Sequence, residues 1–446
     1  MRQATAAQNN SERCAESWRP MKPRARLWNL GFLSLLTTQF FEAASDNLVK
    51  GAIGFAIATS APWEPVFGEG GNGIVAIAFA LPFILLSAFG GRLADRLSKS
   101  RLTILIKSCS FLVAALALFG FSAGMPMLAL ASLILFAIVS AFFGPVKYGM
   151  IAELVAPEQL VRANGIINMA TNVAVIGGGL LAGMVSVHWK DSFVDGTPTG
   201  FGAYLPGLAV LALVVGGFLS CLTLPYLRPQ APELPVNFNP FSTYITTIHE
   251  MSKSPLLATC LAWTYFYFIA AIVLVILPDY SSFLKINDEQ NSYLMAALGA
   301  AIGVGCVGAA YLDRPSWRAR FIAFGAFALA IDTIALGLAP PDYRITMYLL
   351  IAMGLIAGFY IIPLQSMLQL HAPDTSRGRV LGTANGMSFT TGAIGGALFY
   401  GLRTLGMPSN RVFLVVGALT LVVGVLIVLW NRANPTSTHE ASPRHA

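Results

Sequence analysis

Charged residues are scarce in this chain of 446 residues: they make up 11% of it, whereas apolar residues make up 56%. A soluble domain carries about 25% charged residues, so this composition cannot cover a water-exposed surface. Long uncharged runs recur through the whole sequence, and a helix needs roughly 20 apolar residues to cross a bilayer. The composition therefore excludes an ordinary soluble fold and predicts an all-α membrane protein.

Cysteine is also rare, and no cleavable leader is apparent. The chain has five cysteines, none of them in a C-x-x-C pair, and small buried apolar residues are their simplest interpretation. The first 27 residues are polar and basic, without a short apolar core followed by a cleavage site. We therefore expect no metal or other cofactor and no removable signal peptide.

Hydropathy and helix-breaking residues together predict twelve transmembrane helices in two bundles of six. The N-terminal bundle is expected at 28–227 and the C-terminal bundle at 256–432, joined by a cytoplasmic linker at 228–255 and flanked by cytoplasmic tails at 1–27 and 433–446. The linker begins with a proline-rich stretch that no helix tolerates, and its later part suits a short interfacial helix. The twelve spans are expected at 28–60, 72–91, 102–123, 126–148, 163–187, 203–226, 256–283, 292–312, 319–339, 345–370, 380–404 and 411–431.

The predicted topology explains the formal charge of +7, which therefore does not indicate a nucleic-acid partner. With both termini inside, all but six of the 28 Lys and Arg fall in cytoplasmic segments or at their helix ends. Lys50 lies within a span, and the other five fall outside. The positive-inside rule therefore predicts cytoplasmic N and C termini. The five outside cations are Lys190, Lys285, Arg344, Arg403 and Arg411.

Three features recur at one spacing of 218 residues. A common offset across unlike features is hard to obtain by chance, so it indicates that the halves descend from one six-helix unit. Parallel repeats of this kind suit two pseudo-symmetric bundles around a central cavity. The recurring pairs are Asp95-Arg96 with Asp313-Arg314, Pro145 with Pro363, and Ile176-Gly177-Gly178 with Ile394-Gly395-Gly396.

The loop after the second span, Gly91–Arg101, combines a glycine, an aspartate and several cations. Glycine allows close helix approach, and an aspartate at a helix end can cap a neighbouring helix and pair with an arginine. Such a loop would close the cytoplasmic side and release it when the bundles rock; alternatively, it is a basic loop that only sets topology. The predicted gating residues are Gly91, Asp95, Arg96 and Arg101, with Asp313 and Arg314 in a degenerate second copy.

The first span contains residues that are costly in a membrane. Gln39, Glu42, Asp46 and Lys50 lie within a stripe about 80° wide at helical spacing, and Asn47 is adjacent. Asp46 is roughly 21 Å along the helix, past the middle of a core about 30 Å thick. A charge there costs at least about 2.5–3.5 kcal/mol. The stripe is therefore expected to face a cavity or a partner, or else to form a self-neutralised cluster that merely packs.

The fourth span ends in Gly144-Pro145-Val146-Lys147-Tyr148. Pro145 should kink the helix, which places Lys147 near the inner surface. There Lys147 either snorkels to headgroups or contacts an anionic group of a ligand. In the tenth span, Gln365 and Gln369 are one turn apart and either present amides to the cavity or pack.

These segments together resemble the lysophospholipid transporter family of the major facilitator superfamily. That resemblance implies inward flipping of lysophospholipids, such as lysophosphatidylethanolamine, at the bacterial inner membrane, with a separate acyltransferase as a further partner. The family leads us to expect an acidic residue early in the fifth span and an arginine in the seventh, whereas this chain has Asn168 and no cation there. The matching pieces are Asp46-Asn47, Pro145–Tyr148, Arg162–Gly165 and Gly358–Leu364.

The expected partners are a lysophospholipid or other amphipathic small molecule and membrane lipids. The main alternative is a proton-coupled exporter of amphipathic drugs or small solutes, with Glu42 or Asp46 carrying the proton. A membrane enzyme is disfavoured, because the closest approach to an acyltransferase motif, His188–Asp191, falls on the outer face; a receptor or scaffold is a further alternative. The predicted substrate-binding or coupling residues are Gln39, Glu42, Asp46, Asn47, Lys50, Lys147, Tyr148, Asn168 and Gln365.

Overall fold

The computed structural model describes residues 27–433, except 58–61, 68–70, 195, 236 and 238. The described chain is helical apart from its connections and one small hairpin, β1 (Phe193–Val194) and β2 (Thr197–Pro198). The long helices of the first half are α2 (Leu30–Ala56), α4 (Gly71–Arg96), α5 (Lys99–Ser122), α6 (Pro126–Leu154), α7 (Leu160–Asp191) and α8 (Leu205–Cys221). Those of the second half are α10 (Leu256–Leu284), α11 (Asp288–Leu312), α12 (Arg318–Leu338), α13 (Tyr343–His371), α14 (Arg377–Thr404) and α15 (Ser409–Ala433).

Short elements fill the connections. They are α3 (Glu64–Phe67), α9 (Pro240–Ser252) and three 3₁₀ turns, η1 (Pro157–Gln159), η2 (Phe201–Tyr204) and η3 (Pro315–Trp317). The amphipathic helix α9 lies in the segment that joins the two halves, and the Asn239 side chain accepts hydrogen bonds from the first amides of this helix.

Ten of the described helices are long and apolar enough to cross a membrane. The helices α2 and α14 are as long but more polar, because α2 carries the charged stripe and α14 is rich in Gly, Ser, Thr and Asn. Together the twelve long helices confirm the predicted fold class. Several helix ends differ from the expected spans by four to six residues, such as those of α2, α4 and α8. The difference that matters for the site is in α6, which does not end at Tyr148 but continues through Pro145 to Leu154, so Lys147 lies about two turns inside the helix.

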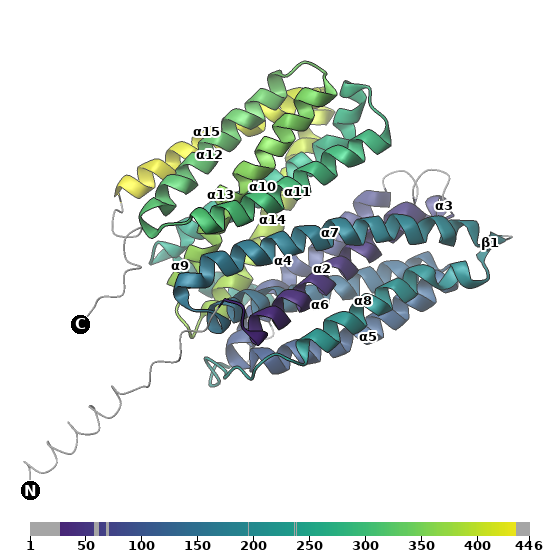
Figure 1. Cartoon of the computed structure of the whole chain (residues 1–446), viewed down its shortest axis with the longest axis horizontal. Helices are drawn as coiled ribbons and strands as arrows, with labels where there is room; N and C mark the ends of the chain where they lie inside the picture. Colours follow the sequence, from purple (N-terminus) through teal and green to yellow (C-terminus); the bar gives the residue numbers. More distant parts are fainter. Residues whose placement is uncertain are drawn as a thin grey trace, which may run out of the picture.

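The halves pack against each other through equivalent helices. In the repeat, α4 corresponds to α11 and α7 to α14, and the inter-half contacts join α4 to α14 and α7 to α11. The described chain begins and ends at the same end of the molecule as α9, which we call the linker end (Figure 1). The β1–β2 hairpin lies at the opposite end, which we call the far end (Figure 1). Helix α9 packs on both α4 and α14.

Candidate functional site

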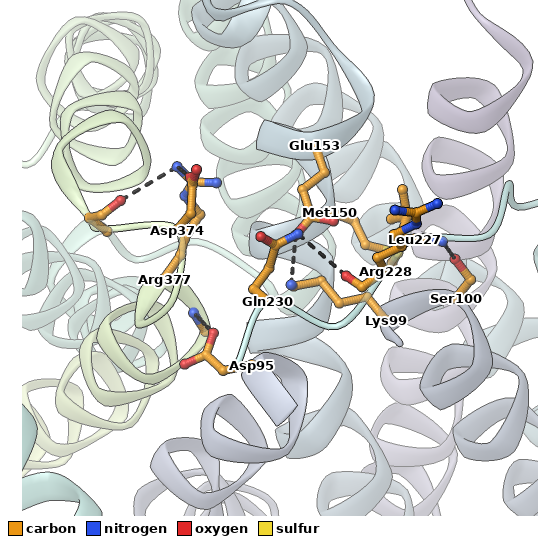
Figure 2. Close-up of polar contacts among 12 residues, drawn as sticks. Asp95, Lys99, Ser100, Met150, Glu153, Leu227, Arg228, Gln230, Asp374 and Arg377 are labelled. Atoms are coloured by element: carbon orange, nitrogen blue, oxygen red, sulfur yellow. Dashed lines mark hydrogen bonds and ion pairs between the residues drawn. The ribbon is translucent and has the colours of Figure 1, made fainter. Parts of the chain in front are cut away.

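Asp95 joins the two halves at the linker end. Its carboxylate accepts hydrogen bonds from the backbone amides of Gly378 (2.6 Å) and Arg379 (3.0 Å), and Arg379 Nε lies 3.5 Å from it. Those amides belong to the first turn of α14, where unpaired N–H groups and the helix dipole favour an anion. Asp95 is completely buried, so it caps α14 in the way the sequence pattern predicts (Figure 2).

The other residues of the Gly91–Arg101 loop hold this junction together. A side chain at Gly91 would overlap the Gly378 carbonyl, so glycine allows α4 to touch α14 here. Arg92 donates to the Pro235 carbonyl of the linker at 2.7 Å, and the Asp95 carbonyl accepts from the backbone amide of Ala231. Arg101 stacks on Tyr226, and Arg96 is half-buried. In Figure 2 the linker residues Arg228 and Gln230 lie beside Lys99.

The second copy of the loop is arranged differently. The Asp313 carboxylate accepts from Arg318 Nε (3.1 Å) and Nη2 (2.9 Å), which lie five residues on in the same loop. Arg314 stacks on Trp317, also in its own loop. These contacts of Asp313 and Arg314 stay within the second half, whereas Asp95 bridges the halves.

A buried amide network joins α7 to α13 at the linker end. Asn164 Nδ2 donates to Gln369 Oε1 (2.6 Å) and to Ser366 Oγ (3.0 Å), and Gln365 Nε2 donates to Asn164 Oδ1 (3.0 Å). Asn168 Nδ2 donates to Gln365 Oε1 at 3.1 Å. The structure thus brings together Asn168 and Gln365, which come from different halves, in a network that packs rather than faces open space.

Aromatic rings complete the closure between the halves. Tyr148 of α6 meets Trp263 of α10 edge to face, with ring centroids 6.2 Å apart. Phe83 of α4 stacks on Phe389 of α14, with centroids 4.0 Å apart. Asn385 of α14 donates to Ser87 Oγ of α4 at 3.0 Å. The linker end is therefore sealed by polar and aromatic contacts over several turns.

The acidic residues of α2 face the inside of the first half. Glu42 forms an ion pair with Lys107 of α5, and both side chains are buried. Ser140 Oγ of α6 lies 2.8 Å from Glu42 Oε1 and 2.7 Å from Asp46 Oδ2. A hydroxyl has one hydrogen and can donate a hydrogen bond to only one of these carboxyl groups. The second contact is a hydrogen bond when that carboxyl group is protonated and its O–H donates to Ser140 Oγ.

Basic and polar residues surround the two carboxyl groups. Lys147 is buried, and its charge interacts attractively with Glu42 and Asp46 and repulsively with Lys107. Lys50 lies over the Phe79 ring, and within the described ranges no ion pair joins it to Asp46. Gln39 donates to Thr171 Oγ1 of α7 at 3.3 Å, and Asn47 to its own helix at the Ala43 carbonyl. We call Glu42, Asp46, Lys107, Ser140 and Lys147 the buried charge cluster.

Two members of this cluster were not predicted from the sequence. The positive-inside pattern predicts Lys107 to be a cation at the cytoplasmic end of the third span, because it lies in the second turn of that span, yet its side chain reaches Glu42. Ser140 carries no signal of its own in an apolar run. A buried carboxylate on one helix does predict that some cation lies opposite, and this is the signal that could have pointed to Lys107. Lys147 is buried rather than at the surface, because α6 extends beyond it.

An apolar cavity of about 1490 Å³, including the space at its open mouth, lies between the halves on the far side of the amide network. Its walls come from α7 in the first half and from α10 and α11 in the second. Asn172 lines the cavity and donates to the Asn168 carbonyl, so the cavity lies next to the amide network. None of the predicted substrate-binding residues lines this cavity. In this conformation the buried charge cluster is separate from it.

Comparisons with known proteins agree with this architecture. The sequence profile of the Major Facilitator Superfamily matches residues 31–400. The lysophospholipid transporter LplT of Enterobacter sp. (strain 638) is 26% identical over 422 residues, covering 91% of this chain and 97% of the relative. LplT of Photorhabdus laumondii subsp. laumondii is 25% identical over 418 residues, covering 90% and 96%.

Solved structures share the fold at lower identity. The human organic anion transporter MFSD10 superposes with a TM-score of 0.72 at 14% identity, covering 88% of this chain and 99% of the other. The proton:xylose symporter XylE superposes with a TM-score of 0.66 at 13% identity, covering 90% and 95%. The resemblance predicted from the motifs is confirmed over nine tenths of the chain: this protein belongs to the major facilitator superfamily, and it is a transporter rather than an enzyme.

Proposed function

We propose that this transporter flips lysophospholipids across the bacterial inner membrane by alternating access, with the linker end and both termini in the cytoplasm. The observation that carries the proposal is an apolar cavity between the halves, beside a linker end that is closed by the amide network and by the contacts of Asp95. Relatives over nine tenths of the chain bear the name lysophospholipid transporter. Each half-cycle would break one closure and form another, as rocking bundles require.

A lysophospholipid has one acyl chain and a small charged headgroup, and the described residues offer matching groups for both. The acyl chain fits the cavity, whose lining has only Asn172 and Ser292 as polar side chains among the described residues. A zwitterionic headgroup needs charges of both signs, and the buried charge cluster supplies carboxyl groups and lysines in one place. In this proposal, opening of the linker end exposes Asp46 and Lys147 to the headgroup.

The direct test is uptake of labelled lysolipid by spheroplasts with and without this chain. We expect uptake of lysophosphatidylethanolamine above the background of cells that lack the chain, and none of diacyl phosphatidylethanolamine. Lysophosphatidylglycerol in parallel measures headgroup preference. Equal uptake with and without a correctly inserted chain would refute the proposal. Retention of the product as a diacyl lipid would indicate a separate acyltransferase in the same cells.

The contact of Ser140 with two carboxyl groups favours a second candidate, a proton-coupled exporter of amphipathic drugs or small solutes. In that case one of the two carboxyl groups gains and loses the coupling proton in each cycle. An uncoupler distinguishes the candidates: lysolipid flipping should survive collapse of the proton gradient, whereas proton-coupled export should stop. Resistance to amphipathic drugs in expressing cells is the complementary measurement.

A further inference from the structure

A second apolar cavity lies in the other half, away from the space between the bundles. Its volume is about 1260 Å³, including its mouth, and it shares no lining residue with the inter-half cavity. Helices α10 and α15 form its two sides, and α13 and α14 contribute to its floor. Helix α15 lies on the outer side of its bundle against α12 (Figure 1). We call this space the outer cavity.

The mouth of the outer cavity opens into the lipid region. Leu261 and Leu426 line it from the two sides and are 51% and 57% exposed. Both belong to helices long and apolar enough to cross the membrane. An exposed leucine on the outer face of such a helix contacts acyl chains, so whatever enters between these two residues comes from the bilayer.

The cavity has the length of one membrane leaflet. Tyr265 Oη and Thr420 Oγ1 are 3.1 Å apart and pin α10 to α15. From Thr420 to Trp430, at the linker-end limit of the cavity, α15 runs about 15 Å at 1.5 Å per residue. This is about half of a hydrocarbon core roughly 30 Å thick. A chain inserted from the linker-end leaflet would therefore reach the Tyr265–Thr420 contact and stop there.

The lining suits hydrocarbon rather than water. Thr391 donates to the Thr264 carbonyl at 2.9 Å, and Thr259 donates to the Pro255 carbonyl at 3.1 Å. These polar groups are already paired within the protein. A water molecule needs two to four polar partners to remain in a cavity, so this lining gives water little to bind.

Cations border the polar end of the outer cavity. Trp430 and Asn431 line that end, Arg432 follows them, and Lys253 precedes the start of α10; Arg432 and Lys253 are exposed. A tryptophan at a helix end is typical of the membrane interface, and exposed cations there attract lipid phosphate. The order along the cavity is thus cationic, interfacial and apolar, which matches a phospholipid from headgroup to acyl tail.

We propose that the outer cavity holds one acyl chain of a diacyl glycerophospholipid from the linker-end leaflet, with its phosphate near Arg432 and Lys253. The bound lipid fills the gap between α10 and α15 and is a resident component rather than the transported molecule. Because the site is separate from the inter-half cavity, this inference holds whichever solute the transporter carries.

Photo-crosslinking of the full-length protein in liposomes tests the site. The probe is phosphatidylethanolamine with a diazirine in one acyl chain, and labelled peptides are located by mass spectrometry. We expect labelling of peptides within 256–267 and 418–432. Ala258→Trp and Val423→Trp, which fill the cavity from opposite sides, should each lose that labelling. Leu219→Trp, at a 58% exposed position of α8, should retain it and controls for a bulky residue at the lipid face.

Three results would overturn the proposal. The first is labelling of the 256–267 and 418–432 peptides no stronger than that of α8. The second is full labelling in both filled variants when each elutes as a folded protein. The third is labelling by a diazirine lysophosphatidylethanolamine but not by the diacyl probe, which would assign the outer cavity to a single-chain ligand. The two filling substitutions lie on different helices, α10 and α15. If one variant misfolds, the labelling of the other still tests the proposal.

Discussion

At the scale of single residues, the ion pair between Glu42 and Lys107 joins α2 to α5 inside the first half. Both side chains are buried, at 8% and 3% exposure. Breaking a buried pair by removing one partner costs about 3–5 kcal/mol, because it leaves an uncompensated charge, whereas replacing both partners is often nearly neutral. Lys107→Met should therefore destabilise the protein by up to about 3–5 kcal/mol, measured as a lower unfolding temperature in detergent.

The double variant Glu42→Gln/Lys107→Met is the matched control for this prediction. It keeps the side-chain volumes and removes both charges, so it should recover most of the stability that Lys107→Met loses. If the two substitutions instead destabilise additively, the residues do not act as a pair and the packing of α2 against α5 explains the loss.

Asp46 belongs to the same cluster but has no lysine partner within ion-pair distance among the described residues. One of its oxygens meets Ser140, and the other has no hydrogen-bond partner. Asp46→Asn keeps the shape and the Ser140 contact, so the folded protein should form at normal levels. Transport should fall to the background of cells without the chain, because the variant loses the charge and the exchangeable proton of Asp46. Uptake by spheroplasts, normalised to expression, measures this.

Asp332→Asn provides the same chemical change at a second buried carboxyl group, on α12 in the other half. It should retain uptake, since Asp332 lies outside the buried charge cluster. Normal lysolipid uptake by Asp46→Asn would remove Asp46 from the mechanism. Equal loss in both variants would show that any lost membrane carboxylate impairs the protein.

Residue-scale predictions from the sequence succeed for burial and fail for partners. The polar stripe of α2 had to leave the lipid, because charges there are costly, and Glu42 and Asp46 are indeed buried. Which cation meets Glu42 depends on how α5 packs against α2, and no local pattern contains that information. The same limit applies to Asp313: its second-copy motif suggested a junction between halves, but Arg318 five residues later captures it.

At the scale of elements, α9 is the piece that touches both halves at the closed end. Tyr244 Oη donates to the Ile84 carbonyl of α4 at 2.7 Å, and a methyl group at Gly386 of α14 would overlap the same Tyr244 hydroxyl. Glu250 of α9 lies 3.7 Å from Arg379 of α14. Tyr244 therefore fits into the α4–α14 seam only because position 386 is glycine.

This geometry predicts a non-additive pair of variants. Gly386→Ala should expel Tyr244 and loosen the linker end, and Tyr244→Ala should do so directly. In the double variant Gly386→Ala should add little to the effect of Tyr244→Ala, because the tyrosine ring that the alanine methyl group would overlap is absent. Ser366 is buried in the amide network, so a cysteine introduced there by Ser366→Cys reports opening of the linker end. The measurement is the rate at which this cysteine reacts with a thiol reagent in a protein that has no other cysteine.

Tyr244→Phe is the milder control. It keeps the ring in the seam and loses one hydrogen bond, worth about 0.5–1.5 kcal/mol, so its effect on the Ser366→Cys rate should lie between wild type and Tyr244→Ala. If Gly386→Ala accelerates the reaction equally with and without Tyr244, the alanine acts on α4 directly and α9 is not part of the closure.

The sequence predicts where the long helices lie but not where each helix ends. Apolar runs locate the long helices, because bilayer thickness fixes the length each must have. They do not locate the exact helix ends, and α6 continues after Pro145 to Leu154. Pro145 removes one backbone hydrogen bond and disfavours the helical conformation of the residue before it. The helix nevertheless continues, because the turn at Gly149–Ile151 is buried and packed against the rest of the protein.

At the scale of the whole molecule, the repeat is what makes the fold predictable. The offset of 218 residues places Pro145 and Pro363 inside equivalent helices, α6 and α13, and it pairs α4 with α11. Two bundles of six follow from it, and so do the crossed contacts of α4 with α14 and of α7 with α11. The conformation does not follow, because one sequence has to support at least two closures of similar free energy.

Asp95 and Asp313 occupy equivalent positions in the repeat but make different contacts. The same substitution at both positions therefore tests whether Asp95 holds the linker end closed. Asp95 accepts two amides of α14 across the seam, whereas Asp313 is held by Arg318 within its own loop. Asp95→Asn loses a charge-assisted acceptor and sets an amide NH₂ against backbone N–H groups. The loss is about 1.5–3 kcal/mol, or about a ten- to hundredfold shift away from the closed linker end.

We therefore expect Asp95→Asn to slow the transport cycle while lysolipid binding stays close to wild type, since Asp95 lies outside both cavities. Spin-label distances across the linker end should lengthen in the same variant. Asp313→Asn, an identical substitution at the equivalent position, should change neither, because its carboxylate spans no seam. A collapse of binding with unchanged kinetics, or equal effects of the two variants, would show that the linker end is not held closed by Asp95 and that the asymmetry between the two loops has no bearing on the cycle.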